Sequence, residues 1–333
     1  MDNASAQSLD LSRWREAPRG IGYRRWSIVA TGLRQLLRTR FFKFVLSVAW
    51  SAGLMIAVAG FVFSQSVADG GWLQDIAVRF GPRTEALFKV LSGLVAMFPD
   101  VVVHGVFTLI FWAHSFLGLW LSLLVLTVLV PQLITRDRGS NALIMYLARP
   151  LTTADYLLGK LGIIVGVIGL VWTGPLLAGW LVSMLFATDR DFIVYSFAPL
   201  LRALVFNGVS LVALAAIALG VSALGRHERT TTVVWMGLWL LLGIIAAPPP
   251  APDWFKRASF THDLSEVRQE VFKLDAVLTD ASAQLPLLDR RFATNLAAAG
   301  KKAEPADFNG ALVSLGVFVV ASSFVFFRKL RPE

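Results

Sequence analysis

Residues 135–160 read TRDRGSNALIMYLARPLTTADYLLGK, and this charged stretch lies between two long apolar runs. The runs cover residues 106–130 and 158–186. An α-helix needs about 20 apolar residues to cross the hydrocarbon core of a bilayer, so each run is long enough to span it. The pattern predicts two transmembrane helices joined by a charged loop, and therefore an integral membrane protein.

The composition of the whole chain agrees with this class. Of the 333 residues, 56% are hydrophobic and 16% are charged, whereas soluble domains contain about 25% charged residues. We expect an all-α membrane protein that forms a single transmembrane domain over residues 1–333. Six segments are predicted to cross the membrane: about 44–63, 106–130, 158–186, 200–223, 232–247 and 309–327. Prolines at 248–252 end the fifth segment, because proline cannot continue a helical hydrogen-bond ladder.

The basic residues indicate which side of the membrane each loop faces. In a six-span protein, those of segment 1–43, loop 131–160, turn 225–230 and the C-terminal tail all fall on one side. Because cytoplasmic loops carry an excess of Lys and Arg, we expect both termini to lie in the cytoplasm. We expect the chain itself to lie in the inner (plasma) membrane. Basic residues that orient the spans and contact anionic lipid account for the net charge of +9. We therefore expect no nucleic-acid partner.

The cytoplasmic segment 1–43 contains a predicted helix that does not cross the membrane. Residues 21–43 combine basic and aromatic side chains with modest hydrophobicity, which favours an amphipathic helix at the membrane interface. Its candidate contact residues are Trp26, Leu33, Arg34, Leu37 and Arg38. Two interpretations stay open: the helix anchors the chain to lipid, or it also packs on a cytoplasmic partner.

The extracytoplasmic loop 248–308 contains a second amphipathic pattern. Apolar residues recur at helical spacing from Leu264 to Leu278, with charged residues between them. This periodicity predicts one helix of about 15–20 residues outside the membrane. It either caps the bundle or docks an extracytoplasmic partner or cargo.

The sequence contains no recognisable catalytic or metal-binding motif. HExxH, GxSxG, the EF-hand loop and the phosphate-binding GxxxxGK[ST] are all absent, and Gly159-Lys160 is followed by Leu161. There is no cysteine, so Cys-based metal sites and disulfides are excluded. We expect that the chain is not an enzyme and holds no cofactor or metal of its own.

Two polar residues within predicted spans, His114 and Asn207, are candidate functional contacts. Such residues mark cargo or proton pathways in some membrane proteins, but a single one more commonly makes an interhelical hydrogen bond. No carboxylate lies deep in a predicted span, which argues against a proton- or sodium-driven carrier. Gly162 and Gly166 have the spacing that lets helix backbones approach closely.

Within the charged loop, the sequence predicts a short exposed helix. Ser140 and Asn141 suit its N-cap, and Pro150 ends it near Arg149. Thr152 and Asp155 then match a capping box that starts the next span. The short helix is apolar, so it either rests on lipid or fits a groove on a cytoplasmic protein.

This loop resembles the one between spans two and three of ABC-2 type ABC transporter permeases, the membrane-spanning subunits of these transporters. The matching parts are Arg136-Asp-Arg, Asn141-Ala-Leu, Tyr146-Leu-Ala-Arg-Pro-Leu-Thr and Tyr156-Leu-Leu-Gly-Lys. Many members of that family have Gly-Thr where this chain has Asn141-Ala142, and Glu is more usual than Asp137.

The resemblance implies a permease subunit that moves an unidentified cargo, with export expected, by coupling to a separate cytoplasmic ATPase. It assigns ATPase coupling to Arg136, Asp137, Arg138, Asn141, Leu143, Ile144, Met145, Leu147, Arg149 and Pro150. ATP and Mg²⁺ would be bound by the partner, and two ATPase copies would serve two permease copies, as a homodimer or a heterodimer. The alternatives are a membrane scaffold that recruits a partner through loop 248–308, and a secondary transporter.

Overall fold

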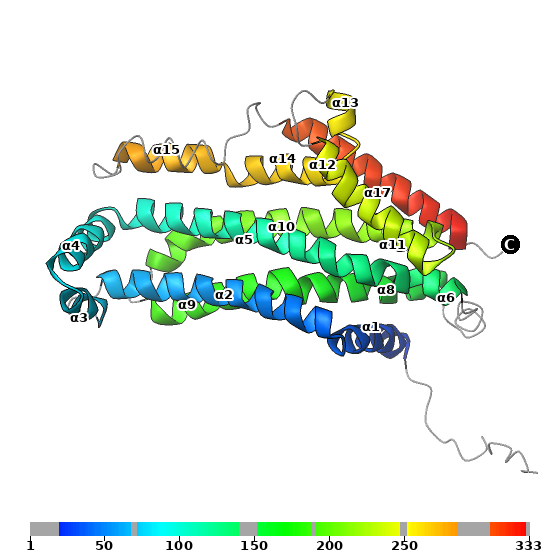
Figure 1. The fold of residues 1–333 in the computed structure, drawn as a ribbon, viewed down its shortest axis with the longest axis horizontal. Coiled ribbons are helices and arrows are strands. Elements are labelled where there is room, and N and C mark those ends of the chain that lie inside the picture. The colour runs from blue at the N-terminus through cyan, green and yellow to red at the C-terminus, as the bar shows by residue number, and fades with distance from the viewer. Residues whose placement is uncertain are drawn as a thin grey trace, which may run out of the picture.

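The computed structural model describes residues 20–67, 72–139, 152–187, 191–246, 252–284 and 307–330. Every regular element in these ranges is helical, which confirms the predicted all-α class (Figure 1). The first half comprises α1 (Ile21–Leu37), α2 (Arg40–Val67), α3 (Trp72–Arg79), α4 (Pro82–Met97), α5 (Pro99–Val130), the π-helical turn η2 (Pro131–Thr135) and α6 (Arg136–Gly139).

The second half begins with the continuous helix formed by α8 (Thr153–Ile168), the π turn η3 (Gly169–Thr173) and α9 (Gly174–Phe186). Then follow α10 (Asp191–Leu224), α11 (Glu228–Met236), the π turn η4 (Gly237–Leu241), α12 (Leu242–Ala246), α13 (Asp253–Lys256), α14 (Phe260–Phe272), α15 (Leu274–Gln284) and α17 (Phe308–Leu330).

Five helices among the described residues are long and apolar enough to cross a membrane: Arg40–Phe63, Pro99–Gly139, Thr153–Phe186, Asp191–Leu224 and Phe308–Lys329. Each of them contains one of the six predicted spans and extends beyond it at one or both ends. The remaining prediction, 232–247, falls on α11–η4–α12, which is not among the five. The count of six spans therefore stays a prediction.

The bundle is organised around α10, which packs against α5, α17 and α14, while α2 packs on α9 and α1 on α8. Its core holds fully buried aromatic rings. Phe107 meets Phe111 edge-to-face at 5.5 Å, and Trp172 meets Phe206 at 5.7 Å, an arrangement that aromatic pairs prefer. The helices α1 and α6 and the C-terminal end of α17 lie at one end of the bundle, and α3 and α4 lie at the other (Figure 1).

The segment before the last span is helical, but it differs from the single helix that its periodicity predicts. Lys273 has a left-handed backbone, with φ 46°, and its N–H bonds to the Gln269 carbonyl at 2.9 Å. This residue ends α14 and starts α15, so the prediction of one continuous helix is wrong. Phe260 and Phe272 of α14 pack against Phe318 and Phe206, each pair at 6.3 Å. Hence α14 lies alongside α10 and α17 rather than beyond their ends (Figure 1).

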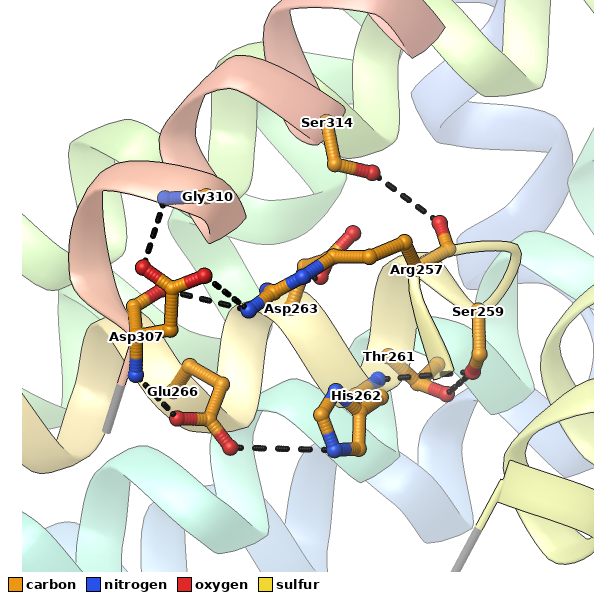
Figure 2. A network of polar contacts seen from close by, with 9 residues as sticks. All are labelled: Arg257, Ser259, Thr261, His262, Asp263, Glu266, Asp307, Gly310 and Ser314. Atoms are coloured by element: carbon orange, nitrogen blue, oxygen red, sulfur yellow. Dashed lines mark hydrogen bonds and ion pairs between the residues drawn. The ribbon is translucent and has the colours of Figure 1, made fainter. Parts of the chain in front are cut away.

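A network of charged groups fixes α14 to the start of α17 (Figure 2). Arg257 donates to Asp263 Oδ1 at 2.9 Å and to Asp307 Oδ2 at 2.7 Å. Glu266 Oε2 accepts from the Asp307 backbone N–H at 3.0 Å. Asp263 is fully buried, and this burial raises the pKa of its carboxyl while Arg257 acts in the opposite direction. The sequence suggests that the charged side of this helix faces solvent, but Asp263 and Glu266 have their partners inside the protein.

Candidate coupling site at the charged loop

The chain enters the charged loop through η2, which α10 holds in place. The backbone N–H groups of Ile134 and Thr135 donate to the Ser222 hydroxyl at 2.9 and 3.3 Å, and the Thr135 hydroxyl donates to the Ser222 carbonyl at 2.8 Å. Pro131 opens this turn and has no N–H to offer to the helical ladder. Ser222 and Thr135 are buried, so these bonds fix the direction in which the chain leaves the bundle.

Asp137 of α6 is at the centre of the best-connected group in this region. Its Oδ2 lies 2.7 Å from Lys160 Nζ of α8 and accepts a hydrogen bond of 2.7 Å from the Tyr156 hydroxyl. Lys160 Nζ also lies 5.3 Å from the centre of the Tyr156 ring. Tyr156 is fully buried, and Lys160 is 8% exposed. The start of the loop is thereby joined to the first turns of α8.

The two arginines beside Asp137 make different contacts. Arg138 donates from Nη1 to the Ala223 carbonyl at 2.8 Å, at the C-terminal end of α10, where helix carbonyls lack partners within the helix. Arg136 lies 3.9 Å from Glu228 of α11, and both of these side chains are half-exposed. Arg138 is therefore part of the scaffold, whereas Arg136 lies at the surface.

The chain re-enters the bundle at the predicted capping box, which the structure confirms. Asp155 N–H donates to Thr152 Oγ1, and Thr152 N–H donates to Asp155 Oδ2, both at 3.2 Å. The other oxygen of Asp155 accepts two hydrogen bonds from the Arg25 guanidinium, one of them from Nε at 2.8 Å. Asp155 therefore starts α8 and also attaches α1 to it.

Glycines of α8 allow α1 to lie against it. A Cβ added at Gly162 would lie 2.6 Å from Val29 Cγ2, and one at Gly166 would lie 2.9 Å from Leu33 Cδ1. The close approach predicted for these glycines thus occurs, and its partner is α1.

Of the five residues predicted for the interfacial helix, Leu33 faces α8, whereas Trp26, Arg34, Leu37 and Arg38 are exposed. The helix ends at Leu37 rather than continuing to residue 43. Its position at the membrane interface stays a prediction.

A cavity of about 300 Å³ lies between α1 and the two ends of the loop. Ser27, Thr31 and Gln35 line it from α1, and Asp137 and Lys160 line it from the other side. The predicted docking residues Asn141, Leu143, Ile144, Met145, Leu147, Arg149 and Pro150 lie outside the described residues. What the structure shows is therefore the frame that holds both ends of that segment.

The two candidate intramembrane polar residues meet at the same place. His114 Nε2 lies 3.3 Å from the Trp172 carbonyl, and Asn207 Oδ1 accepts from the Thr173 hydroxyl at 2.9 Å. Trp172 and Thr173 both belong to η3. The two residues thus connect α5 and α10 to one π turn, as interhelical hydrogen bonds would. A role in contacting cargo stays a prediction.

Sequence reasoning missed several residues of this frame. Tyr156 and Lys160 belong to the family-like pattern, but nothing in the sequence links them to Asp137. Arg25 is one of many N-terminal basic residues, and Ser222 is one hydroxyl in an apolar span. Their partners lie from 19 to 130 positions away, so local patterns carry no signal for them.

Comparison with known proteins places this architecture in a family. No curated protein shows significant similarity to the chain. A family model described as "ABC-2 family transporter protein" matches residues 124–329, more than half of the chain, and this range includes both ends of the charged loop. Members of this family are membrane-embedded components of ABC transporters, and membership implies a partner ATP-binding subunit. The chain belongs to the ABC-2 transporter family.

Proposed function

We propose that the chain is the permease subunit of an ABC exporter and that residues 136–150 couple it to a separate cytoplasmic ATPase. The observation that carries this proposal is the attachment of both ends of the charged loop. Arg138 and Thr135 attach its start to α10, and Asp137 attaches it to α8. Asp155 attaches its end to α1. A movement imposed on the loop would therefore reach three helices, α10, α8 and α1, at once.

The proposed assembly contains two permease and two ATPase copies, with ATP and Mg²⁺ bound by the ATPases. In this proposal the chain lies in the plasma membrane, and both termini and the charged loop face the cytoplasm. The arrangement of α1, α6 and the C-terminal end of α17 at one end of the bundle supports this orientation (Figure 1). The scaffold alternative has less support, because α14, the helix it would use, packs on α10 and α17.

Co-expression with the cognate ATPase tests the proposal. A tag on the permease is expected to recover the ATPase together with ATP hydrolysis. Leu143→Asp places a charge on the proposed docking face, and we expect it to reduce recovery about 30-fold, as loss of an interface hot spot does. Phe80→Asp is the matched control, because Phe80 is 79% exposed in the turn between α3 and α4 at the opposite end of the bundle. Unchanged recovery with Leu143→Asp would refute the docking role.

A further inference from the structure

Arg268 of α14 is a cation that has aromatic neighbours but, among the described residues, no acceptor. Its guanidinium carbon lies 5.0 Å from the ring centre of Trp112 and 5.0 Å from that of Phe116, both on α5. Within the part of the chain that the structure describes, it forms no hydrogen bond or ion pair, and its Nη1 is buried. Aromatic faces attract a cation but do not replace hydrogen-bond acceptors.

The carboxylates of the same helix already have partners. Asp263 is paired with Arg257, and Glu266 accepts from the Asp307 backbone (Figure 2). Glu270 lies 2.8 Å from Lys273 Nζ. Arg268 therefore differs from Arg257, whose guanidinium donates to two carboxylates inside the protein. Those bonds give Arg257 a structural role.

The depth of Arg268 makes the missing acceptor significant. Trp112 and Phe116 lie near the middle of α5, which is one of the candidate membrane spans. Charged groups at such a depth are costly, and they commonly face a partner or a substrate pathway. A guanidinium keeps its charge at neutral pH even when it is buried.

The surroundings suit a ligand that is part ionic and part apolar. A guanidinium that lies over aromatic rings keeps its N–H edge for an acceptor with two oxygens, such as a carboxylate or a phosphate. Phe116 is 48% exposed, and its ring meets that of Trp120 at 6.0 Å. An apolar surface therefore continues from the cation along α5.

We propose that Arg268, Trp112 and Phe116 form a binding site for the phosphate or carboxylate group of a membrane amphiphile. The anionic group meets the guanidinium edge, and the apolar body of the ligand lies along Phe116 and Trp120. The site goes beyond ATPase coupling, because it lies between α14 and α5 rather than at the charged loop, and it concerns what the membrane domain binds.

Lipid binding to the purified full-length chain tests this site without any ATPase. The probes are phosphatidic acid, diacylglycerol with the same acyl chains, and inorganic phosphate. We expect wild type to bind phosphatidic acid at least about 10-fold more tightly than diacylglycerol. Arg268→Gln should weaken phosphatidic acid binding about 10- to 100-fold, the effect of losing hydrogen bonds between charged groups. Arg268→Lys should give an intermediate affinity.

The matched control is Arg83→Gln, which removes an exposed arginine of α4 and should bind as wild type does. Equal phosphatidic acid affinity in wild type and Arg268→Gln would overturn the site. Equal affinity for inorganic phosphate and phosphatidic acid would overturn the assignment to an amphiphile.

A stability measurement separates ligand binding from a structural role. Since Arg268 has no described acceptor to leave behind, Arg268→Gln should keep or raise the melting temperature without lipid. A lowered melting temperature together with unchanged lipid binding would contradict the proposal.

Discussion

Lys160 Nζ lies 2.7 Å from Asp137 Oδ2, and this ion pair joins the two ends of the charged loop. Asp137 stands on α6, where the chain leaves the bundle, and Lys160 stands on α8, after it has returned. The two side chains are only 16% and 10% exposed. Any change in the distance between α6 and α8 must therefore stretch a largely buried pair, so the two helices are expected to move together.

Replacing one partner of this ion pair should lower the free energy of unfolding more than its share of the loss when both partners are replaced. Lys160→Met leaves a covered carboxylate without its cation, and we expect the free energy of unfolding to fall by about 3 kcal/mol. Asp137→Asn should have a similar cost, while the double variant should cost less than the sum, with a coupling energy of about 1–3 kcal/mol. Unfolding in denaturing detergent, followed by circular dichroism, measures all three. Strictly additive costs would show that the two residues do not stabilise each other.

The close contact between α1 and α8 predicts a position-specific glycine effect. Gly162→Ala places a methyl group 2.6 Å from Val29 Cγ2, and we expect a loss of about 1–3 kcal/mol from overpacking. Val29→Ala should restore most of that loss in the double variant, because it removes the clashing methyl. Gly208→Ala is the control, since a Cβ there meets no atom within 4 Å. Equal effects at Gly162 and Gly208 in thermal melts would argue against the contact.

Arg25 is expected to hold the N-terminal helix on the bundle. Arg25→Gln removes the two hydrogen bonds to Asp155, and with Arg25 42% exposed we expect about 1 kcal/mol of lost protection. That corresponds to roughly fivefold faster hydrogen exchange across α1. The matched variant is Arg24→Gln, one position away, whose side chain makes no such bond to the residues that the structure describes. If both variants exchange alike, the Arg25–Asp155 contact does not hold α1.

Much of the fold is predictable because its determinants are local. Five spans follow from apolar length, and the Thr152–Asp155 capping box follows from residues three positions apart. The frame of the coupling site is not local. Arg25 and Asp155 are 130 positions apart, and many basic residues near the N-terminus could have served equally well. A single sequence therefore indicates which residue types are present but not which of them meet.

The charged residues before the last span show a different limit. Their helical spacing predicts a helix with a polar side in water, since charge ordinarily marks solvent. Asp263 and Glu266 are instead buried. Arg257 pairs with Asp263, and the Asp307 backbone N–H donates to Glu266, so both carboxylates have partners inside the protein. Periodicity measures where charge lies on a helix, and only the fold determines what faces that charge.

The two loop arginines should separate coupling from stability. Arg138 donates to the Ala223 carbonyl, so Arg138→Glu loses that bond and places a carboxylate beside the carbonyl end of α10. We expect it to lower the free energy of unfolding by about 1–3 kcal/mol and also to impair coupling. Arg136 and Glu228 are half-exposed and 3.9 Å apart, so Arg136→Glu should change stability by less than about 1 kcal/mol. If Arg136 touches the ATPase, this variant should still reduce ATPase recovery. Melting curves and co-purification on the same preparations measure both effects. A stable Arg136→Glu variant with full ATPase recovery would remove Arg136 from the docking face.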